Sequence, residues 1–164
     1  MSLTVGIAAD LLLLLLAANG APILAKRLFK DWFAMPLDGG RLFFDKRALL
    51  GASKTWRGLI TGVAATALVA GLLGYPMVVG ACFGLASLCG DVLSSFIKRR
   101  LNIPPSGQAF GLDQIPEALL PLLLLRKTFE LDLLAVCLVV ALFVVGELLL
   151  SRLMYAIGIR DRPY

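Results

Sequence analysis

The stretch that decides the fold is residues 58–90, which read GLITGVAATALVAGLLGYPMVVGACFGLASLCG and contain no Asp, Glu, Lys or Arg. A helix needs about 20 mostly apolar residues to cross the hydrocarbon core of a bilayer, so this stretch is too long for one span. Gly74-Tyr75-Pro76 near its middle is typical of a tight turn. We therefore predict two antiparallel membrane-spanning helices here, joined by a very short connection.

The rest of the chain follows the same pattern. Of 164 residues, 59% are hydrophobic and 16% are charged, whereas soluble domains average about 25% charged residues. We predict an all-α integral membrane protein in which residues 1–164 form a single transmembrane domain. The five expected spans are residues 3–25, 58–74, 76–97, 110–126 and 131–156. The two longer loops expected between them are residues 26–57 and 98–109.

The distribution of positive charge predicts the orientation. Arg126 and Lys127 stand apart, and the other 14 of the 16 Lys and Arg residues fall in the two longer loops or near the C-terminus. Because cytoplasmic loops are enriched in Lys and Arg, we expect the N-terminus outside and the C-terminus in the cytoplasm. We expect a multi-pass protein of the cell membrane, and the net charge of +5 clustered in loops argues against nucleic acid as a partner.

The polar residues that close the third span form the first candidate site. Asp91 stands in an apolar segment, where an ionisable side chain is costly and is usually functional. In a helix, Asp91, Ser94, Ser95 and Lys98 project from one face, because their spacing is i, i+3, i+4 and i+7. A carboxylate beside hydroxyl groups and cations is a candidate metal ligand that faces a phosphate.

The second candidate site precedes the second span, where residues 51–58 read GASKTWRG. Glycine and hydroxyl residues at a helix N-terminus favour an anion, and Lys54 and Arg57 add positive charge. The segment lacks the glycine spacing of a Walker A motif. The alternative is a basic patch beside the membrane that contacts anionic lipid headgroups.

Two further clusters lie near the same predicted level. Asn19-Gly20-Ala21-Pro22 predicts a break or kink in the first span, with an ordinary helix end as the alternative. Asp113 and Glu117 are spaced i, i+4, and several carboxylates at one depth without His or thiolate partners suit Mg²⁺. The alternative is that Asp113 caps the fourth helix and Glu117 pairs with a loop cation.

Together these elements resemble the CDP-archaeol synthase family, small membrane cytidylyltransferases related to the phosphatidate cytidylyltransferases. The matching elements occur in the family's order: Asn19-Gly20-Ala21-Pro22, Lys54-Thr55-Trp56-Arg57-Gly58, Gly90 through Arg100, and Asp113-Gln114. The resemblance implies a five-helix membrane fold. It also implies that a lipid phosphate, archaetidic acid-like or phosphatidic acid-like, attacks the α-phosphorus of CTP in the presence of Mg²⁺, giving a CDP-lipid and pyrophosphate.

The fourth element departs from the pattern of the related diacyl enzymes. Those enzymes carry an Asp-Arg-x-Asp element where this chain reads Asp113-Gln114-Ile115-Pro116. Glu117 follows one residue later, and the sequence leaves open whether it replaces the second Asp.

The resemblance assigns roles to residues in four groups. The catalytic group is Asp91, Asp113, Lys54, Arg57 and Lys98. The residues expected to bind the nucleotide are Asn19, Ser53, Lys54, Thr55 and Arg57. Those expected to bind the lipid phosphate are Ser94, Ser95, Lys98 and Arg99, and those expected to bind metal are Asp91, Asp113 and Glu117. The attacking phosphate oxygen is already anionic, so the absence of histidine from the chain is no obstacle.

Two other classes of protein share some of these features. An ion- or proton-coupled transporter or channel also carries intramembrane carboxylates and glycine-rich helices. A non-catalytic protein that binds anionic lipid would explain the basic loops but not Asp91. The absence of an internal repeat and the gathering of charge at one face favour the enzyme. A bundle of 17.6 kDa is also compatible with a homodimer.

Overall fold

A computed structural model describes residues 5–104 and 107–158 of the chain, which are mostly helical. Its five α-helices are α1 (Val5–Phe29), α2 (Trp56–Leu72), α3 (Met77–Arg100), α4 (Gln114–Leu124) and α5 (Leu133–Ala156). These residues contain no strand beyond two isolated bridges, so the predicted all-α fold class is confirmed. Residues 3 and 4 of the first predicted span and residues 105–106 of the second loop lie outside the described residues.

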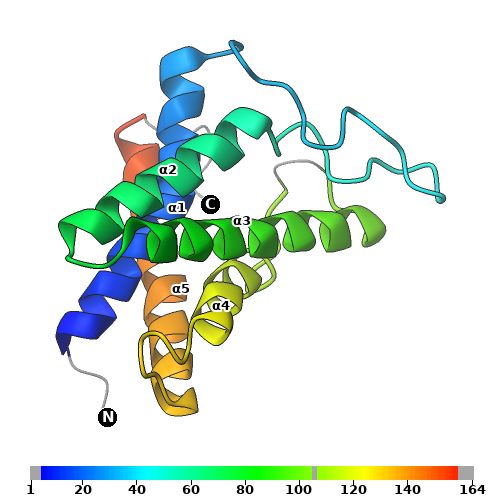
Figure 1. The fold of residues 1–164 in the computed structure, drawn as a ribbon. Coiled ribbons are helices and arrows are strands. Elements are labelled where there is room, and N and C mark those ends of the chain that lie inside the picture. Colours follow the sequence, from blue (N-terminus) through cyan, green and yellow to red (C-terminus); the bar gives the residue numbers. More distant parts are fainter. Residues whose placement is uncertain (1–4, 105–106, 159–164) are drawn as a thin grey trace.

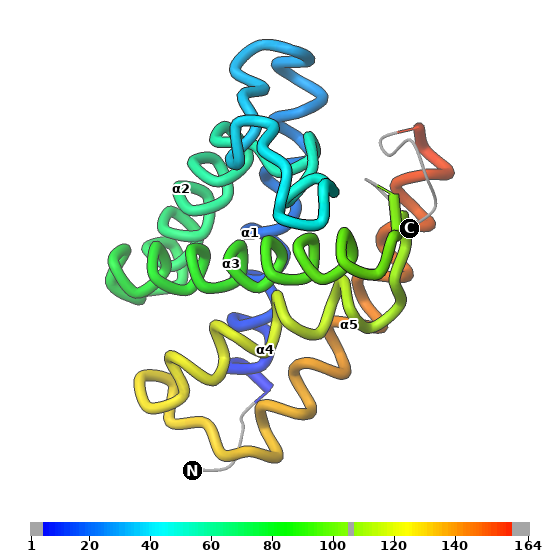
Figure 2. Tube along the Cα trace, turned by 90° about the vertical axis from the view of Figure 1, so that its right-hand side faces the viewer, coloured from blue at the N-terminus to red at the C-terminus, as the bar shows by residue number. Residues whose placement is uncertain are grey.

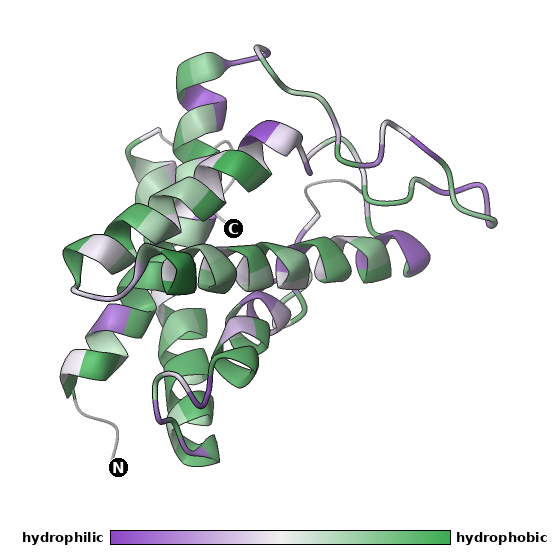
Figure 3. Cartoon of the chain, viewed as in Figure 1, coloured by the Kyte–Doolittle hydropathy of each residue, from purple (hydrophilic) through white to green (hydrophobic). Residues whose placement is uncertain are grey.

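Most helical segments are made of hydrophobic residues, and many of the hydrophilic residues lie in the loops and toward helix ends (Figure 3). Of the described helices, α1, α3 and α5 are long and apolar enough to cross a membrane. Helices α2 and α4 are shorter apolar helices of 17 and 11 residues. Helix α4 starts later than the predicted span 110–126, because Gly111 adopts a φ of +77° in a turn that precedes Gln114.

Helix α1 runs through Pro22 and ends at Phe29, so the chain neither breaks nor ends its helix at Asn19–Pro22. Proline removes one backbone hydrogen bond from a helix, here the bond to the Ala18 carbonyl. A Cβ built on Gly62 of α2 would lie 2.8 Å from that carbonyl oxygen and 3.4 Å from the Pro22 ring. Helix α2 therefore covers the weakened turn, which keeps it out of contact with lipid.

The central helix of the bundle is α3. Figures 1 and 2 show it crossing α1, with α2 on one side and α4 on the other, and with the loop between α1 and α2 projecting from one end. Helices α2 and α3 form the predicted antiparallel pair, joined at Gly74, whose φ of +88° favours glycine. Helix α5 packs against α4 and α1 at the edge of the bundle.

Glycines allow the helix backbones of this bundle to touch. A Cβ on Gly80 of α3 would overlap Ala70 and the Thr66 carbonyl of α2, which explains the Gly80-x-x-x-Gly84 pattern. A Cβ on Gly90 would overlap the carbonyl of Pro116 and the Cα of Glu117 on α4. The residue after Gly90 is Asp91, so this contact brings the two carboxylates of α3 and α4 toward the same place.

Replacing Gly80 with alanine should lower the free energy of unfolding by about 1–3 kcal/mol, because the added methyl group overpacks the contact between α2 and α3. The matched control is Gly146→Ala in α5, where nothing lies within 4 Å of an added Cβ. Thermal unfolding in detergent micelles measures both. Equal melting temperatures for the two variants would contradict the close packing of α2 on α3.

Candidate active site

The loop between α1 and α2 has a fixed shape that is organised by Asp38. The buried Asp38 carboxylate accepts hydrogen bonds from the backbone amides of Gly40, Leu50 and Gly51 at 2.9–3.1 Å. Burial raises the pKa of Asp38, but the hydrogen bonds from Leu50, Gly40 and Gly51 outweigh it, so the pKa lies below its ordinary value of 3.8. Asp38 thereby fixes the start of the segment that carries Lys54.

Backbone contacts then hold Lys54 itself. The amide of Leu37 donates to the Lys54 carbonyl at 2.8 Å, and the amide of Trp56 donates to the Met35 carbonyl at 3.0 Å. Thr55 is the N-cap of α2, since its hydroxyl oxygen accepts the Gly58 amide at 3.1 Å. The lysine side chain therefore leaves the chain at the N-terminus of α2, as the sequence predicts.

Arg100 fastens the same loop to the end of α3. Its guanidinium contacts Asp45 at 3.1 Å, donates to the Ala48 carbonyl at 2.6 Å, and lies over the rings of Phe43 and Phe96. The loop is thus attached to α3 as well as to α2, so it holds Lys54 at a defined place relative to Asp91.

Lys54 reaches across to α3 and pairs with Asp91, with 2.5 Å between Nζ and Oδ2. The two side chains are 20% and 27% exposed and line a cavity of about 400 Å³. The polar side chains that share this cavity include Asn19, Ser53, Thr55, Arg57, Glu117 and Glu147. Cations, hydroxyl groups and carboxylates from all five helices or their ends therefore meet in one space.

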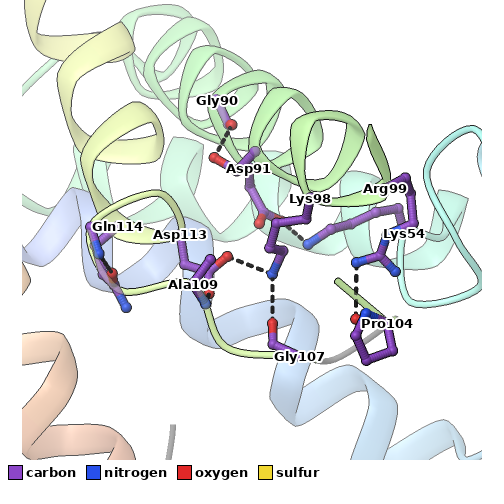
Figure 4. A network of polar contacts seen from close by, with 12 residues as sticks. Lys54, Gly90, Asp91, Lys98, Arg99, Pro104, Gly107, Ala109, Asp113 and Gln114 are labelled. Atoms are coloured by element: carbon purple, nitrogen blue, oxygen red, sulfur yellow. Dashed lines mark hydrogen bonds and ion pairs between the residues drawn. The ribbon is translucent and has the colours of Figure 1, made fainter. Parts of the chain in front are cut away.

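A second cluster lies where α3 leads into α4 (Figure 4). Lys98 pairs with Asp113 at 2.5 Å and donates to the Gly107 carbonyl at 3.0 Å. The other oxygen of Asp113 accepts the Ala109 amide at 2.9 Å. The Arg99 side chain, 5% exposed, donates to the Pro104 carbonyl, and its Nε and Nη1 have no hydrogen-bond partner among the described residues. Those two donors could bind an anion.

The predicted site residues thus divide between the cavity and this second cluster. The predicted residues that line the cavity are Asn19, Ser53, Lys54, Thr55, Arg57, Asp91 and Glu117. Those in the second cluster are Lys98, Arg99 and Asp113. Ser94 and Ser95 are buried in α3 and line neither, and the Ser94 hydroxyl donates to the Gly90 carbonyl at 3.0 Å.

Arg57 and Asn19, which are predicted to bind the nucleotide, also form hydrogen bonds within the protein. Arg57 donates to the carbonyls of Lys30 and Trp32 at 2.7 and 2.6 Å, which ties the end of α1 to the start of α2. Asn19 donates to the Leu15 carbonyl at 3.0 Å and to the Ser87 hydroxyl at 3.4 Å. Both still line the cavity.

Asp113 and Glu117 do not have the structural roles that were the alternative to metal binding. Asp113 is the residue before α4 but makes no capping hydrogen bond with its side chain, because Lys98 and Ala109 occupy its oxygens. Glu117 is 8% exposed and takes part in none of the ion pairs formed by the described residues.

The carboxylates alone do not make a complete metal site. Within residues 5–104 and 107–158, no three Asp, Glu or Cys side chains lie close enough to hold a metal ion together. Mg²⁺ at nucleotide sites is usually bound by one or two carboxylates and by phosphate oxygens. The oxygen donors of Asp91 and Glu117 therefore fit Mg²⁺ only when a nucleotide supplies further ligands.

Two contributors escaped the sequence reasoning. Asp38 precedes Gly39-Gly40, a pattern in which an aspartate organises the turn, and this signal was available. Glu147 is a lone carboxylate within the apolar α5, which by itself marks a functional position. Only the packing of α5 shows that Glu147 reaches the cavity.

Comparison with known proteins agrees with the geometry. A model of the CarS-like family, described as CDP-archaeol synthase, matches residues 10–164. The chain belongs to this family. The CDP-archaeol synthase of Hyperthermus butylicus is 39% identical over 106 residues, covering 61% of this chain and 60% of that protein. That of Thermofilum pendens is 33% identical over 153 residues, covering 90% and 75%.

This chain spans about three fifths of the length of several curated relatives that it matches. A solved structure described as an intramembrane enzyme for archaeal membrane lipids biosynthesis is 30% identical, with a TM-score of 0.75. The match covers 88% of this chain and 92% of that one. The predicted family and the multi-pass membrane fold are confirmed.

Asp38→Asn should lower the free energy of unfolding by about 1–3 kcal/mol at pH 7, because an amide cannot accept all three backbone hydrogen bonds. Since the folded pKa of Asp38 is lowered, its contribution is present above the unfolded pKa of about 3.9 and is lost as pH falls through the folded pKa. The melting temperatures of wild type and variant should therefore begin to converge as pH falls below about 3.9. The exposed Asp31→Asn in the same loop is the control, and a gap that does not narrow as the pH falls below that value would contradict the assignment.

Proposed function

We propose that this chain is a CTP:lipid-phosphate cytidylyltransferase that makes a CDP-activated lipid for membrane lipid biosynthesis. The observation that carries the proposal is the Lys54–Asp91 pair in a polar cavity within an intramembrane bundle. Membership of the CDP-archaeol synthase family supports the reaction class. Charged pairs are costly at such a place, so a ligand that uses both charges explains why they are kept.

The ion pairs suit a magnesium–nucleotide complex. Without ligand, Lys54 neutralises Asp91 and Lys98 neutralises Asp113. A bound triphosphate would give Lys54 a phosphate oxygen, and Asp91 with Glu117 would hold Mg²⁺, which neutralises charge on the phosphates. Cavity and second cluster together contain the cations that a triphosphate and a lipid phosphate require.

The proposed reaction needs no proton transfer. An oxygen of the lipid phosphate attacks the α-phosphorus of CTP, a new phosphoanhydride bond forms, and the bond between the α- and β-phosphates breaks to release pyrophosphate. The chain contributes positioning and charge neutralisation, which supply most of the catalysis in phosphoryl transfer. Lys54, Arg57 and the N-terminus of α2 would orient the triphosphate, while Lys98 and Arg99 are candidates for the lipid phosphate or the departing pyrophosphate.

A groove between α1 and α5 supports a lipid substrate. It has a volume of about 230 Å³, is lined mostly by apolar side chains of the two helices, and shares Asn19, Ile23 and Glu147 with the polar cavity. A lipid could therefore place its phosphate in the cavity while one hydrocarbon chain lies in the groove. Apolar lining does not distinguish ether-linked isoprenoid chains from acyl chains, so the proposal covers both.

The proposal includes a location. The cavity lies at the end of the bundle that carries the long basic loop, which the distribution of Lys and Arg assigns to the cytoplasm. CTP would then reach it from the cytoplasm and the lipid would enter from the inner leaflet of the cell membrane. A homodimer remains a prediction.

Asp91→Asn should reduce release of pyrophosphate from CTP at least 100-fold, since Lys54 loses its partner and the metal loses a ligand. The assay contains purified protein, Mg²⁺ and a panel of diether and diacyl lipid phosphates. Asp10→Asn is the control, because its carboxylate contacts Tyr75, outside the cavity. Full activity of Asp91→Asn would contradict the assignment. A wild-type chain that conducts ions in liposomes without consuming CTP would support a transporter instead.

Gly146→Phe should raise the KM for the lipid phosphate roughly tenfold and leave the KM for CTP unchanged, because the ring would fill the groove between α1 and α5. Gly146→Ala, which adds a methyl group in open space, serves as the control. Steady-state kinetics in mixed micelles measure both constants. An unchanged KM for the lipid would remove the groove from the proposed lipid path.

A further inference from the structure

We propose that Glu147 is a positioning residue that acts through Gln114 on the turn carrying Asp113. The proposal rests on the cytidylyltransferase function proposed above. Its basis is a chain of hydrogen bonds that links α5 to the start of α4. Apart from Arg152, Glu147 is the one charged residue among the residues of α5.

The hydrogen bonds converge on Glu147, which accepts from α5 and from the first residue of α4. The Ser151 hydroxyl donates to Glu147 Oε1 at 2.9 Å, and the Gln114 amide nitrogen donates to Glu147 Oε2 at 3.0 Å. The amide oxygen of Gln114 in turn accepts the backbone N–H of Gly111 at 3.0 Å. Ser151 and Gln114 are 2% and 5% exposed, and Glu147 between them is partly exposed and lines the cavity.

The far end of this chain is the turn that orients Asp113. Gly111 lies between Ala109, whose amide binds Asp113 Oδ2, and Asp113 itself, whose Oδ1 pairs with Lys98. Gly111 has a φ of +77°, a conformation that its hydrogen bond to Gln114 helps to fix. Releasing Gln114 would therefore release the turn and the Lys98–Asp113 pair.

Donor and acceptor chemistry explains why residue 147 is a carboxylate. The Gly111 N–H uses the only oxygen of the Gln114 amide, so the amide nitrogen must face an acceptor. Ser151 presents a second donor to the same side chain. The two donors approach different oxygens of Glu147, so Glu147→Gln turns an amide NH2 toward one of them and leaves that buried donor without its acceptor.

Exchanging the side chains of residues 147 and 114 tests this matching of donors and acceptors. In the double variant Glu147→Gln and Gln114→Glu, residue 114 accepts from Gly111 with one oxygen and from the new amide nitrogen with the other. The amide oxygen at position 147 then accepts from Ser151. These three hydrogen bonds are restored and the total charge is unchanged, but the carboxylate has moved from α5 to α4.

The experiment measures CTP turnover and hydrogen–deuterium exchange of residues 107–114 for the wild type and variants in detergent. Glu147→Gln should lower kcat roughly 10- to 100-fold, with a change of less than about threefold in the KM for CTP, and should speed exchange in this peptide. Gln114→Ala, which leaves the Glu147 charge in the cavity, should show the same defects. The double exchange should restore kcat and protection to within about threefold. Glu130→Gln in the α4–α5 loop is the control.

Two results would overturn the proposal. A folded double variant as inactive as Glu147→Gln, with normal exchange, would overturn it and place the carboxylate in direct contact with substrate. Wild-type kcat in both Glu147→Gln and Gln114→Ala would also overturn it. If the wild type shows no CTP turnover, the cytidylyltransferase function is contradicted instead. Hydrogen–deuterium exchange of residues 107–114 would then still test the link from Glu147.

Discussion

The interaction on which the site depends is the ion pair between Lys54 and Asp91, which lies at the polar end of a mostly apolar bundle. A lone charge at that place would be strongly destabilising, so each partner requires the other at hydrogen-bonding distance. Three nearby contacts hold the loop that carries Lys54 in place. Asp38 shapes the loop, Thr55 caps α2, and Arg100 fastens the loop to the end of α3.

Backbone contacts supply the other half of the geometry. Because Gly90 has no side chain, α4 approaches α3 until the Pro116 carbonyl lies against it, and Glu117 is drawn toward Asp91. Pro116 occupies the position where the sequence pattern of the diacyl enzymes has a second Asp. The backbone carbonyl at this position packs on Gly90, a contact that any residue could make, and Glu117 is the acidic residue of α4 that lines the cavity.

The cavity joins two environments. One side is lined by charged and hydroxyl groups suited to a nucleotide, and the other shares Asn19, Ile23 and Glu147 with an apolar groove between α1 and α5. A water-soluble triphosphate and a lipid phosphate could therefore meet without either crossing the bundle. Lys54 and Lys98 are paired with Asp91 and Asp113, which limits the cost of keeping charge at membrane depth.

The sequence alone determined the membrane class, the helix pair around Gly74, the family and seven of the polar residues that line the cavity. These follow from hydropathy, from unpaired charges in apolar segments and from motif order, all of which are local along the chain. Only the tertiary structure decided that α1 continues through Pro22, that Lys98 and Asp113 form a separate pair, and that Glu147 joins the site. Those depend on contacts between residues far apart in sequence, where packing against another helix outweighs the local preference of the chain.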